Sequence, residues 1–197
     1  MAITTQMVKD LRQATGAGVM DCQKALVQTD GDMEKATEIL RQKALAAAAK
    51  KSERTAADGR IESYVHPGNR LATLVEVSCE TDFVARTEDF RALCHDLAMQ
   101  VAAANPRWVS REEIPADVLE AEQSHYRTQL AGENKPEAVM ERILEGKLGK
   151  FYQENCLLEQ PFIKDDTKTI RNLVMEAIAR FGENVVIRRF ARFQIGS

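Results

Sequence analysis

A repeat of two residues in the side chains of residues 71–79 constrains the fold more than any other feature of the sequence. Successive side chains of a β-strand point to opposite faces of a sheet, so a period of two predicts a strand with one buried face. A shorter apolar run at residues 61–65 precedes it, and the turn-forming sequence His-Pro-Gly-Asn at residues 66–69 separates the two. These features predict an antiparallel hairpin. The side chains expected to be buried are Leu71, Thr73, Val75, Val77 and Cys79.

The C-terminal residues 185–195 also alternate and supply a candidate third strand, which a hairpin needs for stable folding. Helical patterns fill the segments between the strands. The expected fold class is therefore α+β, with a core domain that holds a three-stranded antiparallel sheet and packed helices. One face of the third strand would carry Val185, Ile187, Ala191, Phe193 and Ile195, interrupted by Arg189. The other face would carry Val186, Arg188, Phe190, Arg192 and Gln194.

Four helices are expected between the hairpin and the C-terminal strand. Thr87 can cap the first, whose apolar side chains recur at helical spacing. Two charged helices follow at about residues 116–130 and 136–151, and Thr167 can cap the last, which Gly182 stops. The residues expected to face the core from the first of these helices are Phe90, Leu93, Leu97 and Val101.

The N-terminal residues are predicted to form a separate bundle of three short helices. Thr4 or Thr5 can cap the first helix, Gly16 can end it, and Asp32 can cap the third. The following stretch to Arg60 is rich in Ala, Lys and Arg and offers almost nothing to bury, which is typical of a helical extension that grades into a linker. We therefore expect a three-helix domain at residues 1–50, a linker at 51–60 and the α+β core domain at 61–197.

Composition limits the classes of function that the chain can have. Its 197 residues carry a formal net charge of −3, so no overall positive field attracts nucleic acid or an anionic membrane. The longest apolar stretch is too short and too rich in alanine to span a bilayer, and the N-terminus lacks the apolar core of a signal peptide. A cytoplasmic protein is expected. The four cysteines form no CxxC pair and are expected to be buried structural residues: Cys22, Cys79, Cys94 and Cys156.

No catalytic or cofactor motif stands out. The sequence lacks GxxxxGK[ST], HExxH and GxSxG, so no nucleotide, zinc or serine-hydrolase site is indicated. Cys94, His95 and Asp96 are adjacent on a predicted helix, where neighbouring side chains point about 100° apart and cannot form a catalytic relay. We expect no enzyme activity, no metal site and no cofactor. A carboxylate pair assembled from distant residues stays open.

Two connections carry apolar side chains where turns normally use polar ones or glycine. Phe83 lies in the sequence ETDFVAR, between the second predicted strand and the following helix. Val19 and Met20 follow the glycine-containing loop after the first helix. Loops run over the surface, so each side chain either folds back into its own core or contacts another protein. The pattern alone does not decide between the two.

Three stretches in order resemble the signatures of bacterial translation elongation factor Ts, the guanine nucleotide exchange factor of elongation factor Tu. They are LRQATGAGVMDCQKAL at residues 11–26, VEVSCETDFVAR at 75–86 and GENVVIRRF at 182–190. The sequences AADGRI at 56–61 and QPFIKDDTKTI at 160–170 are similar too, so the resemblance covers nearly the whole chain. The resemblance implies an N-terminal three-helix module of the ubiquitin-associated (UBA-like) type and a core with a three-stranded sheet. It indicates a short form without a second core unit, which pairs with itself as a homodimer.

The resemblance also implies the residues that contact elongation factor Tu. The segment Thr81, Asp82, Phe83 and Val84 would intrude beside the Mg²⁺ and phosphate site of that GTPase and displace the ion, and Val19, Met20 and Asp21 would dock the N-terminal module. Asp82 has two interpretations: it anchors the backbone that follows it, which we favour, or it disfavours phosphate nearby. No cofactor, membrane or direct nucleic-acid contact is expected.

Two alternatives of other classes stay open at this point. An RNA-binding or ribosome-binding module would use Arg188, Arg189 and Arg192 with Phe190 as a stacking strip, and its binding would depend strongly on salt. An enzyme would use Cys79 or Cys94 as a nucleophile, and alkylation of the thiol would abolish its activity.

Overall fold

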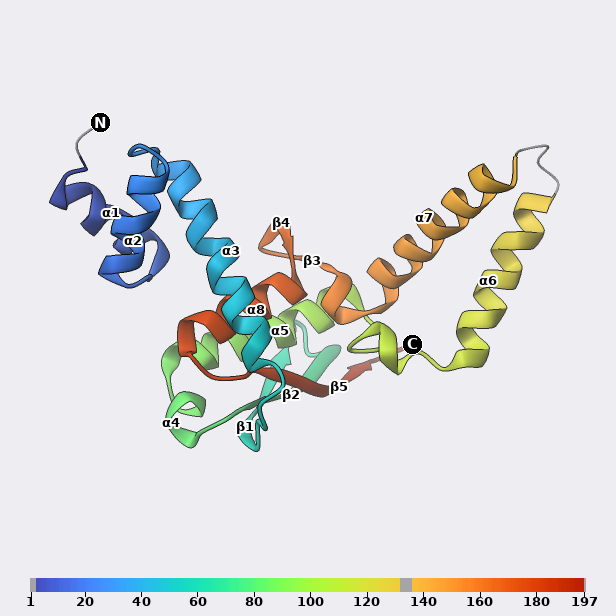
Figure 1. Ribbon diagram of the computed structural model, residues 1–197. Coiled ribbons are helices and arrows are strands. Elements are labelled where there is room, and N and C mark those ends of the chain that lie inside the picture. The colour runs from blue at the N-terminus through green and yellow to red at the C-terminus, as the bar shows by residue number, and fades with distance from the viewer. Residues whose placement is uncertain (1–2, 132–135, 197) are drawn as a thin grey trace.

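Three strands form the antiparallel sheet that the sequence predicts. The computed structural model describes residues 3–131 and 136–196. The strands β1 (Asp58–Val65), β2 (Leu71–Cys79) and β5 (Val186–Gln194) lie in the order β1-β2-β5, with both pairs antiparallel (Figure 1). β1 begins at Asp58 rather than Ile61, and Gly59 allows this: a Cβ at Gly59 would lie 2.2 Å from the Val77 carbonyl oxygen. The α+β class and the three-stranded sheet are thus confirmed.

The alternation predicted for the C-terminal strand is wrong beyond Ile187. Ile187 pairs with Val77 and Arg189 with Glu76, so Arg188 is an extra residue on β5. Such a β-bulge reverses which side chains point inward along the rest of the strand. As a result, Phe190 packs against the core and Phe193 is 65% exposed. A bulge leaves no mark in a two-residue pattern, because it depends on the register with the neighbouring strand.

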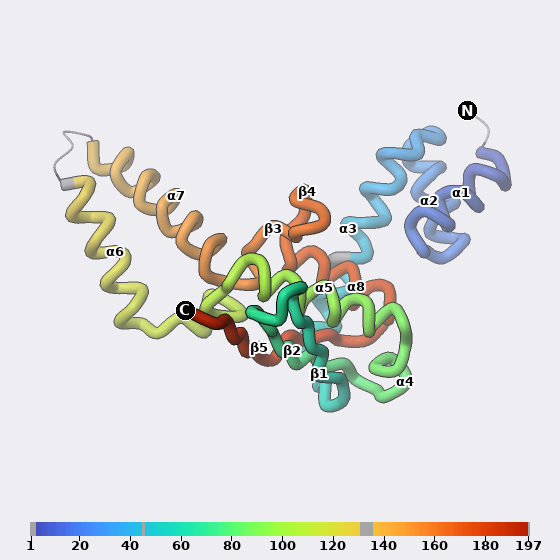
Figure 2. Tube along the Cα trace, turned by 180° about the vertical axis from the view of Figure 1, so that it is seen from behind, coloured from blue at the N-terminus to red at the C-terminus, as the bar shows by residue number. Residues whose placement is uncertain are grey.

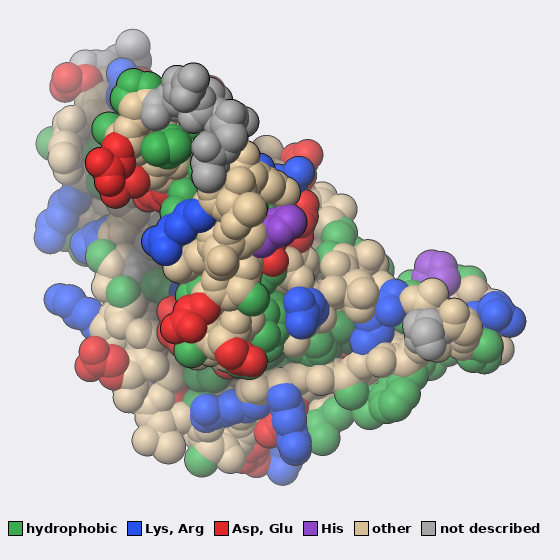
Figure 3. Space-filling view, turned by 90° about the vertical axis from the view of Figure 1, so that its right-hand side faces the viewer, with side chains coloured by type: hydrophobic (Ala, Val, Ile, Leu, Met, Phe, Trp, Pro, Cys, Tyr) green, Lys and Arg blue, Asp and Glu red, His purple; other side chains and the backbone are tan. Residues whose placement is uncertain are grey.

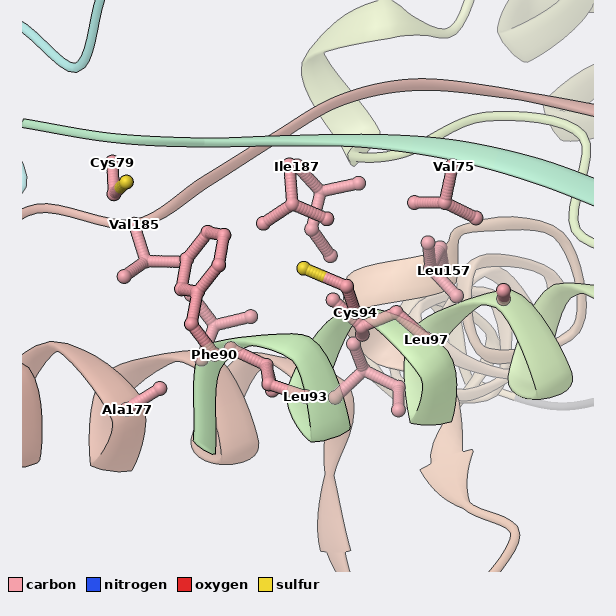
Figure 4. Packing of buried hydrophobic residues seen from close by; sticks show 14 of the residues in the cluster. Val75, Cys79, Phe90, Leu93, Cys94, Leu97, Leu157, Ala177, Val185 and Ile187 are labelled. Carbon is pink, nitrogen blue, oxygen red and sulfur yellow. The ribbon is translucent and has the colours of Figure 1, made fainter. Parts of the chain in front are cut away.

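Among the residues that the structure describes, helices cover only one face of the sheet. α5 (Glu88–Ala104) lies across all three strands, and α8 (Ile170–Phe181) packs beside it. Thr87 caps α5 by accepting a hydrogen bond from the Phe90 amide, as predicted. Figure 4 shows Phe90, Cys94 and Leu97 directed from α5 toward Val75, Val185 and Ile187. The predicted core residues of α5, all buried, are Phe90, Leu93, Leu97 and Val101.

The N-terminal helices α1 (Thr5–Thr15), α2 (Val19–Gln28) and α3 (Met33–Lys51) enclose a small core of their own. Thr4 and Asp32 cap α1 and α3, and Gly16 ends α1 in the left-handed conformation, all as predicted. The expectation that residues 41–60 bury almost nothing is wrong, since Ala48 is fully buried in the main core. Alanine is small enough to let α3 pack closely on α8. α3 thus joins the three-helix bundle to the sheet domain (Figure 1).

Two long helices, α6 (Ala116–Ala131) and α7 (Glu137–Asn155), form an antiparallel hairpin. The hairpin extends away from the sheet on the side opposite to α1 and α2, as Figure 1 and Figure 2 show. α7 continues to Asn155, beyond the predicted end at residue 151. Among the residues that the structure describes, no helix is long and apolar enough to cross a membrane.

Short elements connect the hairpin to α8: the 3-10 helices η1 (Arg111–Glu113) and η2 (Leu157–Glu159) and the strands β3 (Pro161–Phe162) and β4 (Asp165–Thr169). The prediction that Thr167 caps the last helix is wrong. Thr167 lies in β4 and bonds with Asp165, whereas Thr169 caps α8 by accepting from the Asn172 amide. Both threonines have suitable chemistry, and the β3–β4 pairing decides which of them ends the extended segment.

Candidate functional site

A single turn of helix, α4 (Asp82–Ala85), connects β2 to α5 and carries the most exposed large apolar side chain of the described residues. The Phe83 side chain is 83% exposed. Its neighbour Val84 is partly buried against the main core, and Ala85 is buried. Because successive side chains of a helix point in different directions, Val84 and Ala85 face the core while Phe83 faces solvent. Of the two interpretations of Phe83, the structure supports the one in which the ring does not enter its own core.

Thr81 starts α4, and Asp82 does not cap it. The Thr81 hydroxyl accepts a hydrogen bond from the Val84 amide at 3.5 Å. The Asp82 carboxylate instead forms an ion pair with the Arg86 guanidinium at 2.9 Å, one helical turn away. The favoured interpretation of Asp82 as the backbone anchor is therefore wrong, because the residue before it already fills the N-cap position. Asp82 is 46% exposed at its side chain and lies beside Phe83 on the surface.

The second predicted contact region lies at the start of α2. Val19 is 49% and Met20 63% exposed, and Gly18 precedes them as the N-cap. Asp21 is engaged within the chain: its carboxylate accepts a hydrogen bond from the Lys43 ammonium of α3, which lowers the pKa of Asp21. The apolar pair is therefore free for another surface, whereas Asp21 links α2 to α3.

Both regions lie at the same end of the molecule. Figures 1 and 2 place α4 and the α1–α2 bundle on one side of the sheet domain and the α6–α7 hairpin on the other. α3 spans the distance between the bundle and the sheet domain. Both candidate contact regions therefore lie on the side of the sheet domain opposite to the α6–α7 hairpin.

Comparison with known proteins identifies the family of the chain. A family model described as Elongation factor TS matches residues 6–197. The chain belongs to the elongation factor Ts family. It is 56% identical to elongation factor Ts of Herpetosiphon aurantiacus over all of both chains. It is 57% identical to elongation factor Ts of Caldanaerobacter subterraneus subsp. tengcongensis over 98% of this chain and 97% of the relative. Family membership supports a role in translation elongation as the nucleotide exchange factor of elongation factor Tu.

The cysteines of this elongation factor Ts chain are unsuited to nucleophilic catalysis. All four are buried and free, as expected. Burial raises the pKa of Cys79 to about 11 and that of Cys94 to about 12, so both thiols are protonated near neutral pH. The thiolate is the reactive form of cysteine, which removes the chemical basis for the enzyme alternative. Among the described residues, no group of three or more His, Cys, Asp or Glu side chains is placed to hold a metal ion.

The RNA-binding alternative loses its stacking strip. Phe190 is partly buried and packs against the core, so it does not form an exposed strip for bases. Arg188 donates to the Ser78 hydroxyl at 3.2 Å and to the Ala56 carbonyl at 2.7 Å. Arg192 donates to the Ala102 carbonyl, and Arg189 forms an ion pair with Glu76 on the uncovered face of the sheet. These arginines stabilise the elongation factor Ts fold itself.

Sequence reasoning missed the residues that hold α4 in place. The Glu183 carboxylate accepts hydrogen bonds from the backbone of residues 80 and 81, and the Asn184 amide donates to the Glu80 carboxylate. Both residues belong to the stretch GENVVIRRF, in which the helix stop at Gly182 is followed by two polar side chains. Two polar side chains after a helix stop are a signal visible in the sequence. Their hydrogen-bond partners lie about a hundred residues away, so the sequence does not show that Glu183 and Asn184 hold α4.

Proposed function

We propose that this chain releases GDP from elongation factor Tu by inserting Phe83 beside the Mg²⁺ and phosphate site of that GTPase. The observation that carries the proposal is the 83% exposure of a phenylalanine on a short helix anchored at its base. A ring of this size is costly to leave in water, and burying it in a pocket of the partner contributes about 1.5–3 kcal/mol. This free energy is available to offset a distortion of the partner.

Displacement of Mg²⁺ is the proposed means of nucleotide release. Mg²⁺ requires nearly ideal octahedral geometry, so a small shift of one loop or helix weakens its coordination. Without the ion, the diphosphate loses its main positive counter-charge and leaves more readily. Within the segment of residues 81–84, Phe83 is the wedge and Asp82 lies beside it, while Thr81 and Val84 support the turn from inside.

A second contact, separate from the wedge, would hold the factor on its partner. We propose that Val19 and Met20, both exposed at the start of α2, dock on the nucleotide-binding domain of the partner, with Asp21 beside them. Two separate contacts give the wedge a fixed point from which to act.

Because coupling between two ligands is reciprocal, a factor that weakens nucleotide binding is itself bound less tightly once nucleotide returns. Incoming GTP therefore releases the factor. The proposal places this function in the cytoplasm and needs no cofactor, membrane or nucleic acid.

Release of fluorescent GDP from elongation factor Tu, measured by stopped flow with Mg²⁺ present, tests the proposal. We expect wild type to accelerate release and Phe83→Ala to lose roughly tenfold to a hundredfold of that acceleration, the equivalent of the buried ring. Ile163→Ala is the matched control, because Ile163 is 43% exposed on the β3–β4 hairpin, away from α4. A folded Phe83→Ala variant with wild-type activity would contradict the role of the ring, and an inactive wild type would contradict exchange itself.

We further propose a homodimer through the uncovered face of the sheet. That face carries Ile61, Val65, Leu74 and Phe193, all exposed, with Ile195 just beyond the strand. Figure 3 shows hydrophobic side chains gathered along the lower edge of the molecule, where the sheet lies in Figure 1. A second copy with the same surface can cover such an apolar face. Sedimentation equilibrium should give the dimer mass for wild type and the mass of one chain for Leu74→Asp; a monomeric wild type at tens of micromolar would exclude the dimer.

A further inference from the structure

The connection between α8 and β5 is bonded to the connection that carries α4. One oxygen of the Glu183 carboxylate accepts from the Glu80 amide at 3.1 Å and the Thr81 amide at 3.0 Å. Its other oxygen accepts from the Thr81 hydroxyl at 2.6 Å. In the reverse direction, the Asn184 amide donates to the Glu80 carboxylate at 2.7 Å. Hydrogen bonds to a carboxylate are stronger than those between neutral groups, so four bonds of this kind hold the two segments firmly together.

Thr81 is the residue through which these bonds reach the wedge. Its carbonyl oxygen accepts from the Ala85 amide and from the Cys79 thiol, both at 3.2 Å, and its hydroxyl caps the Val84 amide. Thr81 also donates two hydrogen bonds to the Glu183 carboxylate, one from its amide and one from its hydroxyl, so every polar group of Thr81 is engaged. A helix of one turn has no stability of its own, so its orientation depends on how its ends are held. Glu183 holds the end next to Phe83.

The same connection reaches the N-terminal half of the chain. The side-chain amide of Asn184, which is 2% exposed, donates to the Ser52 carbonyl at 3.0 Å and the Arg54 carbonyl at 2.6 Å, just after α3 ends. The Arg54 guanidinium also lies 3.7 Å from the Glu80 carboxylate. α3 packs against α1 and α2, and its Lys43 binds Asp21, the residue next to Met20. The adjacent residues Glu183 and Asn184 thus fix both contact regions to one point of the core.

We propose that Glu183 is a positioning residue for nucleotide exchange, which acts on the partner through the orientation it gives Phe83. The proposal rests on the exchange mechanism proposed above. If the carboxylate is removed, the backbone at residues 80 and 81 loses its acceptor and the turn that carries Phe83 samples several orientations. The ring then enters its pocket in only a fraction of encounters. Docking through Val19 and Met20 does not depend on that orientation.

Stopped-flow release of fluorescent GDP from elongation factor Tu at increasing factor concentration separates these effects. For Glu183→Ala we expect the saturating rate to fall roughly tenfold, because a misplaced group loses most of its effect in a site that requires exact fit. The half-saturating concentration should change by less than about twofold, because the docking contact is kept. Glu145→Ala, which removes an exposed carboxylate from α7, is the matched control and should match wild type in both values.

A double-mutant cycle with Phe83 distinguishes positioning from a general effect on the fold. If Glu183 acts only through the ring, Glu183→Ala has no further effect on the saturating rate once Phe83 is alanine. If it acts through the fold as a whole, the two losses multiply. The conservative variant Glu183→Gln should stay within about threefold of wild type. Its carbonyl can accept both amides, and its amino group can donate to the Thr81 hydroxyl.

Each outcome decides the inference. A wild type that does not accelerate release, or a Phe83→Ala variant as active as wild type, overturns the proposed function and the positioning role with it. An active wild type with a folded, fully active Glu183→Ala variant overturns the positioning role alone, as do multiplicative losses in the cycle. If Glu183→Ala does not fold by circular dichroism, Glu183→Asp takes its place, because it keeps the charge but is one methylene shorter. The inference is supported if Glu183→Ala lowers the saturating rate when Phe83 is present and has no further effect when Phe83 is alanine.

Discussion

The turn α4 and the helix α5 place two phenylalanines in opposite environments within a short stretch of chain. Phe83 of α4 is 83% exposed, whereas Phe90 in the first turn of α5 is fully buried and contacts Phe181 edge to face, with ring centroids 5.8 Å apart. The two residues have the same intrinsic hydrophobicity. What separates them is the direction in which each helix face points: α5 lies across the sheet, and α4 presents one side to it and the other to solvent. One residue type thus fills the core in one region and lies in solvent a few residues earlier in the chain.

Alanine substitution at both positions is the largest test of this comparison. We expect Phe90→Ala to reduce the free energy of unfolding by about 3–5 kcal/mol, because it leaves a cavity under the sheet. Phe83→Ala should change it by less than about 0.5 kcal/mol, as is usual for exposed sites. Urea unfolding followed by circular dichroism measures both. A loss of more than about 2 kcal/mol for Phe83→Ala would mean that the ring packs inside the folded protein in solution.

Two carboxylates, those of Glu159 and Asp82, differ in burial in the same way as the two phenylalanines. Glu159, 16% exposed at its side chain, binds the guanidinium groups of Arg111 at 2.5 Å and Arg171 at 2.7 Å, and so ties η2 to η1 and α8. Asp82 has one exposed ion pair, with Arg86. We expect Glu159→Gln to cost about 1–3 kcal/mol, since it weakens hydrogen bonds to charged groups. Asp82→Asn should cost less than about 1 kcal/mol. Equal costs in urea unfolding would show that burial does not distinguish the two pairs.

The pH dependence of unfolding sharpens this second test. Burial alone would raise the pKa of Glu159, but the hydrogen bonds and charges of Arg111 and Arg171 outweigh it and lower the pKa below its ordinary value of 4.5. A carboxylate with a lowered pKa stabilises the fold fully above its unfolded-state pKa and loses that contribution as pH falls through the folded-state value. The difference in stability between wild type and Glu159→Gln should therefore be largest near neutral pH and shrink below about pH 4.5. A difference that is constant down to pH 3 would contradict the ion-pair role.

The sequence predicted the parts of the fold in which local pattern and final environment agree. The hairpin and the buried face of α5 follow from periods of two and of about 3.6 residues, and the caps at Thr4, Asp32 and Thr87 follow from side-chain chemistry. The errors occur where the environment comes from elsewhere in the chain. The bulge at Arg188 is set by the register with β2, and the burial of Ala48 is set by α8.

The candidate site was predictable to the same extent. An apolar side chain in a connection was visible in the sequence, and the family resemblance assigned Phe83 and Met20 to partner contact. Their exposure could not be read from residue type, because an isolated phenylalanine fits a core as well as a surface. The anchor of α4 was assigned to Asp82, the nearest acid, whereas Thr81 and the distant Glu183 fill that role. Contacts between segments far apart in sequence leave no local signal.

The smallest expected effect concerns Met20 in the N-terminal bundle. Met20 and Leu26 both lie on α2, but Met20 is 63% exposed and Leu26 is buried in the small core. Met20→Ala should change the free energy of unfolding by less than about 0.5 kcal/mol. If the side chain docks on elongation factor Tu, the half-saturating concentration in the GDP-release assay should rise about fivefold while the saturating rate is kept.

Val27 provides a matched control for this last prediction. It is 59% exposed on the same helix, about 10 Å further along its axis at the helical rise of 1.5 Å per residue. Val27→Ala removes apolar surface from the same bundle and should leave both kinetic values unchanged. An equal rise for both variants would mean that the whole exposed side of α2 contacts the partner. A fall in the saturating rate for Met20→Ala would mean that the bundle helps to orient the wedge rather than only docking it. Only an isolated rise in half-saturating concentration assigns Met20 to recognition and Phe83 to nucleotide release.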